Sequence, residues 1–544
     1  MVKVKFAVLL SVALLSLAGC ETKQRAECPA GKLCMHAANQ NDPETLDPPK
    51  TSLVIEDNIL SDLFVGLVTN DAAAEPIPGA AESWTTSPDG LTWTFKLRPH
   101  LWSDGTPVTA QDFVFSFRRL VDPKTAAQYA YFGYLLKNGQ AINGGKAPLE
   151  SLGAKALDDH TLELDLVHPV PYLAQILKHQ VMYPTPEHVV RKWGDAWAAP
   201  EHMVSNGPYT LASWRLGDKI KLAKNPRFYD AAHVCLDEVN YYPIADATSA
   251  ERQVRRGELD LSNTIRSSRV AYLRRPDQVP AYIHTYTYLG VGWIAMNTHI
   301  AAFRDKRVRL ALDMALDREF YADKLMRAGE KPAYGFVPPG IANYPGGVKA
   351  YFADWPLARR QAEARRLLAE AGYGPKHPFR FELSYSTGSN AAVPPAIQAD
   401  LRAVGVQVTL AQAEGQVFFA NLNARNFQAG WANWLADYND PNTFLYLLQS
   451  QTGQQNYGDY NNPVYDKLLD QADHEPDAAK RAQYLQQAEQ VMLDDGAILP
   501  FFFWVSRNIV NPNVTGWVDN IIDQHRKRWM CFKDADARRA ASGH

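Results

Sequence analysis

The sequence predicts an α/β fold built from layers of sheets and helices. Segments with a two-residue hydrophobic period alternate along the whole chain with segments of helical period. Strands are expected in "LTWTFKLRP" (91–99) and "HTLELDL" (160–166), where apolar and polar side chains alternate. Helices are expected in 356–372, which opens at a proline and closes at a glycine, and in 476–496. This order favours α/β layers over a bundle or a sandwich.

Length and composition indicate a globular body with more than one core. The chain has 544 residues, of which 46% are hydrophobic and 11% aromatic, and its length predicts roughly two to four domains. Lys and Arg together number 56 against 59 Asp and Glu, and the sequence has no basic tract. A nucleic-acid partner is therefore not expected.

The first residues predict export from the cytoplasm. Two lysines precede the apolar run "FAVLLSVALLSLAGC", which is shorter than the roughly 20 residues that cross a bilayer. The run ends in "LAGC", which resembles a bacterial lipobox. That resemblance implies a lipoprotein signal peptide at 1–19 and lipidation of Cys20, which would hold an extracytoplasmic (periplasmic) protein at a bacterial membrane. The alternative is an ordinary signal peptide that happens to end in cysteine.

The four other cysteines form an even set in an oxidising compartment. Cys28 and Cys34 enclose a short loop and can bridge locally, which leaves Cys235 and Cys531 to link distant segments. Metal binding is the competing interpretation. However, the sequence has only one close cysteine pair, C-x5-C, and no nearby histidines at the spacing typical of a zinc site. We therefore expect disulfides and no metal.

Motifs typical of enzymes are missing. The sequence has no phosphate-binding glycine loop, no H-E-x-x-H, no G-x-S-x-G and no G-x-G-x-x-G. The 14 histidines are scattered, and His160 and His179 are interpreted as surface or core residues. We therefore expect no cofactor and no catalytic residues, although catalytic groups that are distant in sequence would escape such a search.

The most informative segment is "LWSDGTPVTAQDFVFSFRRLVDP" (101–123). Residues 103–107 have the composition of a tight turn, and Thr109 with Asp112 approximates a capping box before an amphipathic helix. The segment closely resembles the signature of the extracytoplasmic peptide-binding proteins that serve ATP-binding-cassette (ABC) importers. Further blocks match in the same order, so the resemblance covers essentially all of the chain after Cys20: "DPETLDPP", "PIPGAAESW", "VSNGPYTLASW", "NPRFYD", "FRDKRVRLALDMALDRE", "RRLLAEAGYG" and "WLADYNDP".

The resemblance implies a two-lobed clamshell of the periplasmic-binding-protein type (type II-like) with an extra inserted α/β domain. By the matching blocks, lobe I takes residues 21–64, 188–288 and 504–544. The inserted domain takes 65–187, and lobe II takes 289–503. This division places Cys235 and Cys531 in the same discontinuous lobe.

The resemblance also implies a function and a site. Family members bind extended peptides between the lobes and deliver them to the transmembrane subunits of an ABC permease; we expect a monomer. Matching positions imply that Asp437 receives the ligand's α-ammonium, that the backbone at Val54 contacts the peptide and that Tyr129 lines the site. Trp434 is assigned to the same ligand-binding set, together with Trp431 and Gly415.

Some positions depart from the family pattern. A peptide-binding member has arginines implicated in catching peptide carboxylates where this chain has Leu422 and Trp431. Gly415 stands where a tryptophan is expected, and Ser52 stands where a glutamate is expected. The far end of the site is therefore predicted to be altered, and with it the preferred peptide length or ligand class. Arg425 is near enough in sequence to be a substitute.

Two questions stay open at this stage. The segment "WANWLADYNDPNTF" (431–444) contains two carboxylates and no lysine or arginine, so Asp437 either meets a bound ammonium or caps the following helix, while Asp440 before Pro441 is expected to cap. The function is either a transport receptor or an extracytoplasmic enzyme or chaperone on the same fold. Within the receptor class, the ligand is a peptide or another small molecule, such as a cell-wall peptide, a dipeptide or a metal chelate.

Overall fold

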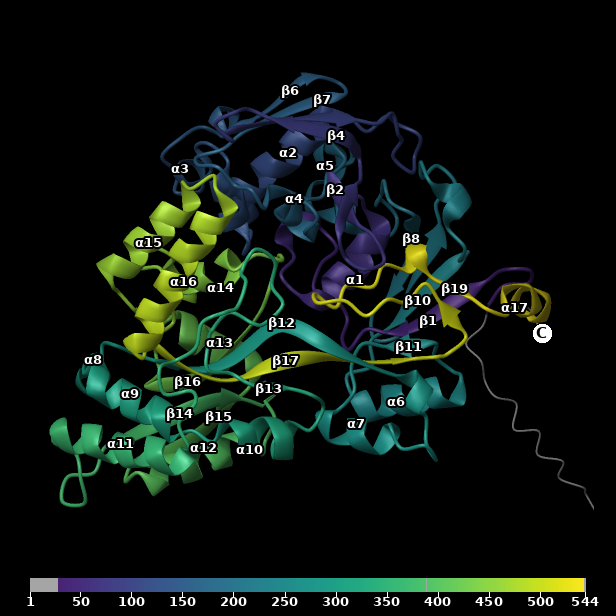
Figure 1. Cartoon of the computed structure of the whole chain (residues 1–544). Helices are drawn as coiled ribbons and strands as arrows, with labels where there is room; N and C mark the ends of the chain where they lie inside the picture. The colour runs from purple at the N-terminus through teal and green to yellow at the C-terminus, as the bar shows by residue number, and fades with distance from the viewer. Residues whose placement is uncertain (1–27, 388, 543–544) are drawn as a thin grey trace, which may run out of the picture.

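The structure, a computed structural model, describes residues 28–387 and 389–542 and confirms the α/β fold. The predicted signal peptide and Cys20 lie outside the described residues. Most of the strands form one large sheet and one smaller sheet, and helices cover both (Figure 1). We propose the division predicted from the sequence and use its names, lobe I, inserted domain and lobe II, for the same residue ranges below.

The large sheet has 11 strands and extends through both lobes. Its order is β15-β14-β16-β12-β17-β11-β1-β10-β9-β8, with β13 beside β17. Lobe II supplies one end of the sheet and lobe I the other. The strands are β1 (Cys34–Ala38), β8 (Tyr209–Arg215), β9 (Lys219–Lys224), β10 (Glu238–Tyr242), β11 (Leu261–Ser262), β12 (Ile283–Met296), β13 (Lys331–Pro332), β14 (Arg380–Ser386), β15 (Gln407–Ala413), β16 (Ala429–Leu435) and β17 (Ile498–Val510).

The two longest strands, β12 and β17, connect the lobes across the middle of the molecule (Figure 1). They pair antiparallel, but the register shifts between the pairs Thr287↔Val505 and Val291↔Phe503. Such an irregularity interrupts the ladder and bends the strands. The predicted lobe boundaries, 288/289 and 503/504, fall at this shift, and we propose it as the hinge between the lobes.

The inserted domain contains a four-stranded antiparallel sheet of order β4-β5-β7-β6. Its strands β5 and β7 confirm the predicted alternation, and Phe95, Leu162 and Leu164 are fully buried. The capping box predicted for α2 is formed by Thr109 and Asp112. The elements are β2 (Val68–Asn70), β3 (Pro76–Pro78), β4 (Ala81–Thr86), β5 (Thr92–Leu97), β6 (Ala154–Asp158), β7 (Thr161–Asp165), α2 (Ala110–Val121), α3 (Gly139–Asn143) and α4 (Leu173–Ile176). The next helix, α5 (Glu187–Trp193), begins at the last residue of the domain and otherwise belongs to lobe I.

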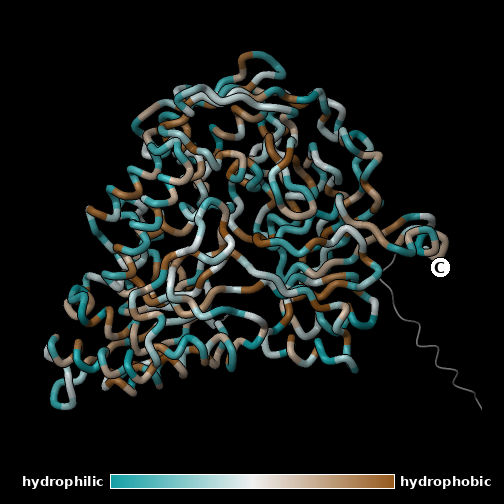
Figure 2. The backbone as a smooth tube through the Cα atoms, viewed as in Figure 1, coloured by the Kyte–Doolittle hydropathy of each residue, from teal (hydrophilic) through white to brown (hydrophobic). Residues whose placement is uncertain are grey.

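Helices cover the lobes, and many are amphipathic, with hydrophilic and hydrophobic stretches alternating along the tube (Figure 2). The predicted helices at 356–372 and 476–496 are confirmed as α11 and α16. Lobe I has α1 (Val54–Leu63), α6 (Ala247–Arg256), α7 (Ser267–Leu273) and α17 (Ala535–Ala541). Lobe II has α8 (Ala301–Arg304), α9 (Lys306–Ala315), α10 (Arg318–Phe320), α11 (Leu357–Glu370), α12 (Val393–Ala403), α13 (Gly415–Asn423), α14 (Asn442–Leu445), α15 (Pro463–Asp473) and α16 (Ala478–Asp494).

The apolar cores show which parts pack together. One continuous cluster joins lobe I to the inserted domain and includes Leu63 and Val239 of the lobe with Phe95 and Phe117 of the insert. Two further clusters lie within lobe II, apart from a few residues beyond its ends. Because a shared core resists separation, lobe I and the inserted domain form one body, which faces lobe II.

Both predicted disulfides are confirmed. Cys28 pairs with Cys34, with a Cα–Cα distance of 5.7 Å. Cys235 pairs with Cys531, with a Cα–Cα distance of 5.6 Å. The second bridge fixes β19 (Cys531–Phe532), which pairs with β18 (Val514–Thr515), to the middle segment of lobe I.

Within the part of the chain that the structure describes, no helix is both long and apolar enough to cross a membrane.

Candidate functional site

A cavity of about 250 Å³ lies where lobe I, the inserted domain, the hinge and lobe II meet. Lobe I contributes the start of α1 and part of the C-terminal segment, and lobe II contributes the end of β16 and the loop after it. The lining residues are Ser52, Leu53, Val54, Asp57, Asn58, Tyr129, His179, Gln180, Tyr288, Asn433, Trp434, Leu435, Ala436, Asp437, Ile522, Asp523 and Gln524.

Asp437 lies in the loop between β16 and α14 and is held by three hydrogen bonds. Its backbone N–H donates to Thr443 Oγ1 at 3.2 Å. The Tyr129 hydroxyl donates to Oδ1 at 3.3 Å, and the Tyr131 hydroxyl donates to Oδ2 at 3.2 Å. The two tyrosines come from the inserted domain, so the carboxylate of one body is bound by hydroxyl groups of the other.

The charge of Asp437 has no cationic partner among the described residues. Burial raises the pKa of Asp437 to about 7, and the hydrogen bonds from Tyr131 and Tyr129 act in the opposite direction. No lysine, arginine or histidine contributes to that pKa. A cation that entered the cavity would therefore gain a strong interaction with the ionised carboxylate.

Asp440, three residues later, differs from Asp437 in that its charge is compensated within the protein. Its carboxylate is fully buried and forms a two-pronged ion pair with Arg481, with both N–O distances at 2.8 Å. It also accepts a hydrogen bond from the N–H of Asn442, the first residue of α14, at 3.0 Å. Asp440 thus has the capping contact predicted for it, together with a cation that the sequence pattern did not reveal.

The histidine on the cavity wall carries no positive charge. His179 is buried and stacks on Tyr129 with ring centroids 5.3 Å apart. Burial lowers the pKa of His179 to about 3. Of the two interpretations given for His179, a surface or a core residue, its burial agrees with the second, and the residue also lines the cavity.

Two further aspartates line the same cavity. Asp57 accepts a hydrogen bond from Gln524 through Oδ2 at 3.2 Å, while its Oδ1 is buried with no hydrogen-bond partner among the described residues. Asp523 accepts from Asn508 at 2.7 Å and lies 2.9 Å from a ring nitrogen of His525. The lining contains three aspartates and no lysine or arginine, so the cavity favours cationic groups.

The predicted ligand-binding residues divide into two groups. Asp437, Tyr129, Val54 and Trp434 all line the cavity, and Val54 is 48% exposed there at the start of α1. Trp434 donates through Nε1 to Thr443 Oγ1 at 3.5 Å, beside the Asp437 contact. Their contacts with a ligand stay a prediction.

Trp431 and Gly415 do not line this cavity. Trp431 is 1% exposed and packs against Phe501, with ring centroids 5.2 Å apart, because its side chain belongs to the core of lobe II. Gly415 is the first residue of α13. The suggested substitute cation, Arg425, is ion-paired with Asp459 at 2.9 Å and is not on the cavity wall either.

Sequence reasoning missed three wall residues, Asp57, His179 and Tyr288, and it also missed Tyr131, which binds Asp437 from outside this cavity. Tyr131 lies two residues from Tyr129 in "AAQYAYF", and this spacing is the one signal that could have drawn attention to it. The contact that gives it a role comes from a carboxylate 306 residues away.

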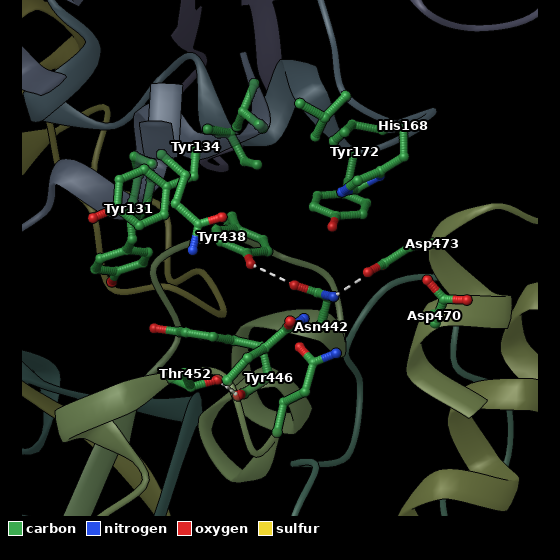
Figure 3. Close-up of a pocket in the computed structure, with 18 of the residues that line it drawn as sticks. Tyr131, Tyr134, His168, Tyr172, Tyr438, Asn442, Tyr446, Thr452, Asp470 and Asp473 are labelled. Carbon is green, nitrogen blue, oxygen red and sulfur yellow. Dashed lines mark hydrogen bonds between the residues drawn. The ribbon is translucent and has the colours of Figure 1, made fainter. Parts of the chain in front are cut away.

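The structure contains a second cavity, of about 350 Å³, which shares no lining residue with the first (Figure 3). It lies between the inserted domain and lobe II, where Tyr131 and Tyr438 are part of its wall. Tyr131 also binds Asp437, so one tyrosine connects the two cavities. No group of three or more His, Cys, Asp or Glu side chains that could hold a metal ion occurs in residues 28–387 and 389–542.

Comparison with known proteins identifies the family. The profile of the bacterial extracellular solute-binding proteins, family 5, matches residues 75–456. The chain belongs to this family. It is 36% identical over 527 residues to the periplasmic oligopeptide-binding protein OppA of Salmonella typhimurium, covering 93% of this chain and 96% of the relative.

Solved structures of family 5 proteins have the same fold. The murein tripeptide-binding protein MppA of Escherichia coli superposes with a TM-score of 0.84 at 34% identity, covering 93% of this chain and 99% of that one. OppA of Haemophilus influenzae, in complex with the peptide RPPGFSPFR, gives a TM-score of 0.82 at 33% identity, covering 93% and 100%. These relatives are named as binding proteins, and their structures agree with the family 5 clamshell fold.

Proposed function

We propose that this protein is the peptide-binding receptor of an ABC importer, which encloses an extended peptide between its lobes and delivers it to a membrane permease. The observation that carries the proposal is Asp437, a carboxylate on a cavity wall with two tyrosine hydroxyls and no cation bound to it. A peptide's α-ammonium is the cation that fits this position. The kinship with peptide-binding members of family 5 supports the same ligand class.

Binding would proceed through contacts that only a closed protein makes. The ammonium group of the ligand pairs with Asp437 of lobe II, while Tyr129 and Tyr131 of the inserted domain hold both carboxylate oxygens. The peptide backbone then passes the exposed start of α1 at Val54. Because the two bodies share these contacts, ligand binding favours closure about the β12–β17 hinge.

A shorter or modified peptide is the second candidate ligand. The observation in its favour is the absence of lysine and arginine from the lining of the 250 Å³ cavity, with Leu422 and Trp431 at the positions of the expected arginines. A ligand carboxylate then has no fixed cationic partner on this wall. The murein tripeptide-binding relative supports a cell-wall peptide as a member of this class.

The receptor role requires an extracytoplasmic location. Relatives named as periplasmic support an extracytoplasmic location, and the "LAGC" motif ending at Cys20 supports a lipid anchor in a bacterial membrane. A monomer is part of the same proposal. No cofactor and no catalytic step is part of this proposal.

Native mass spectrometry of the purified protein tests the ligand class directly. We expect a co-purifying population whose added masses fragment as peptides and which disappears in Asp437→Asn. A wild-type protein that carries only non-peptide adducts, and takes up none of a random free-amine peptide library, would refute the peptide class.

A further inference from the structure

The second cavity differs from the first in the way its walls are built. The inserted domain forms one side and lobe II forms the other, with α15 at the rim (Figure 3). Its lining residues are Tyr131, Phe132, Tyr134, Leu135, Gln140, Val167, His168, Val170, Tyr172, Ile176, Tyr438, Asn442, Tyr446, Gln449, Gln451, Thr452, Gln455, Asp470, Asp473 and His474.

Aromatic rings are the main feature of its walls. Tyr172 of the inserted domain stacks on Tyr438 of lobe II, with centroids 5.4 Å apart and planes 11° apart. Tyr131 stacks on Tyr446 in the same way at 5.7 Å. Aromatic faces attract alkyl chains through dispersion and cations through their quadrupole. These walls therefore suit a long side chain that ends in a positive charge.

The rim supplies the matching negative charge. Asp470 and Asp473, both from α15, line the cavity, and the lining contains no lysine or arginine. The nearest guanidinium, Arg481, is already paired with Asp440 and lies over the ring of Tyr172 at 4.7 Å. Two histidines, His168 and His474, also line the cavity, and His474 lies 3.5 Å from Asp470.

Asp473 is held in position by a short chain of hydrogen bonds. Tyr438 donates to Asn442 Oδ1 at 2.9 Å, and Asn442 Nδ2 donates to Asp473 at 3.4 Å (Figure 3). This single long hydrogen bond satisfies little of the carboxylate's capacity. Burial raises the pKa of Asp473, while His168, Arg481 and His474 act in the opposite direction, so a ligand cation would add to a partial compensation.

The two cavities share no lining residue, but Tyr131 and the backbone at residues 437–438 link them. Tyr131 binds Asp437 with its hydroxyl and forms part of the wall of the second cavity with its ring. Asp437 and Tyr438 are consecutive residues that face the first and the second cavity respectively. A side chain attached to the carbon that bears the ammonium at Asp437 therefore starts beside the tyrosine walls.

We propose that the second cavity is a specificity subsite that receives a basic side chain, lysine or arginine, of the ligand's amino-terminal residue. The aliphatic part of that side chain packs against the tyrosine rings, and its cationic end reaches Asp470 and Asp473. This inference rests on the proposed function, because it takes the α-ammonium at Asp437 as its starting point. The ligand class that follows is peptides whose first residue carries two positive charges, the α-ammonium and the side chain.

The test is calorimetry with three tripeptides that differ only in their first residue: Lys-Ala-Ala, norleucine-Ala-Ala and Glu-Ala-Ala. Wild-type protein should bind the lysine peptide about tenfold more tightly than the norleucine peptide, because the lysine ammonium is attracted to two carboxylates and to the faces of the aromatic rings. In Asp470→Asn/Asp473→Asn the difference should fall to twofold or less, with norleucine-Ala-Ala bound as in wild type.

Asp466→Asn is the matched control, since it removes a charge from the same helix, α15, but lines neither cavity. It should keep the full preference for lysine. If the double variant does not fold, Asp470→Asn alone serves, because that side chain is 70% exposed, and it should lose part of the preference.

Two results would overturn the subsite. Wild type could bind the lysine and norleucine peptides equally, or the preference could persist in the double variant. Either result leaves the receptor function intact. If wild type binds none of the three peptides, the proposed function fails as well, so the two failures are distinguishable.

Discussion

Asp437 and Asp440 lie three residues apart, and their carboxylates are compensated in different ways. Asp440 has Arg481 in a buried pair, whereas Asp437 has two tyrosine hydroxyls and no cation among the described residues. A buried carboxylate without a counter-ion lowers the stability of the folded state. The ligand-free protein therefore keeps a destabilised carboxylate that a bound ammonium would relieve, as is common at binding sites.

The first prediction is that Asp437→Asn stabilises the ligand-free protein at neutral and alkaline pH. The folded-state pKa of Asp437, about 7, lies above its ordinary value of 3.8. Between these values the folded state holds a proton that the unfolded state has lost, so the aspartate costs stability increasingly as the pH rises and fully above pH 7. The variant removes this cost, on the order of 2 kcal/mol after allowance for water in the cavity.

Urea unfolding of the wild type and the variant at pH 4 and pH 8 checks the direction of this change in stability. The free energies of unfolding should nearly agree at pH 4 and differ at pH 8, with the variant more stable. Asp440→Asn provides the opposite control, because it strands Arg481 and should cost about 3 kcal/mol. A loss of stability at pH 8 in Asp437→Asn would show that its carboxylate is compensated within the protein.

At this scale the sequence could predict Asp437 but not its partners. The absence of cations in 431–444 drew attention to Asp437, and the family resemblance supplied the hypothesis that a ligand's α-ammonium pairs with it. Tyr131, Asp57 and Arg481 could not be assigned, because their contacts join segments far apart in the chain. No local period encodes such contacts.

At the scale of elements, the sequence predicts those that carry a local hydrophobic pattern and misses those that depend on pairing with distant strands. Strands β5 and β7 and helices α11 and α16 were predictable because one face of each is apolar. The two-residue strand β11 was not, since it exists through pairing with β1 and β17. The register shift in β12 and β17 likewise has no signature in either strand alone.

The second prediction concerns the bridge that holds the C-terminal strand β19. Cys235 and Cys531 are 296 residues apart, so their disulfide restricts the unfolded chain more than the Cys28–Cys34 bridge with its separation of 6. Replacing both residues of the long bridge by alanine should cost roughly 5 to 6 kcal/mol, and the same change in the short bridge about 2 kcal/mol, in the chain-entropy model.

Thermal and urea unfolding of the two double variants measure the difference. Free-thiol labelling of the denatured, unreduced wild type should find no reactive cysteine among these four. Labelling of two or more of them, or equal losses of stability in both variants, would contradict this account of the bridges.

At the scale of the whole molecule, both cavities lie between two bodies. Lobe I and the inserted domain share one core, and lobe II has its own. The family resemblance predicted the clamshell and placed the boundaries near the register shift of the hinge strands. It did not predict the second cavity, which depends on side chains from α15 and the inserted domain meeting in space.

The third prediction concerns the membrane anchor. Cys20 precedes the described residues and ends an apolar run too short to span a bilayer. In the bacterial host, Cys20→Ser should release soluble protein or leave an uncleaved precursor, as followed by fractionation and intact mass. Membrane attachment and mass that are unchanged by the substitution would exclude a lipid on this residue.

The central claim is that the α-ammonium of a peptide is the missing cation of Asp437. Calorimetry with a panel of free peptides and the same peptides N-acetylated measures this most directly, in wild type and in Asp437→Asn. Because breaking a buried ion pair costs about 3 to 5 kcal/mol, wild type should bind free peptides roughly a hundredfold or more tightly than acetylated ones. The variant should bind both forms equally weakly. Equal binding of free and acetylated peptides by wild type would contradict the claim.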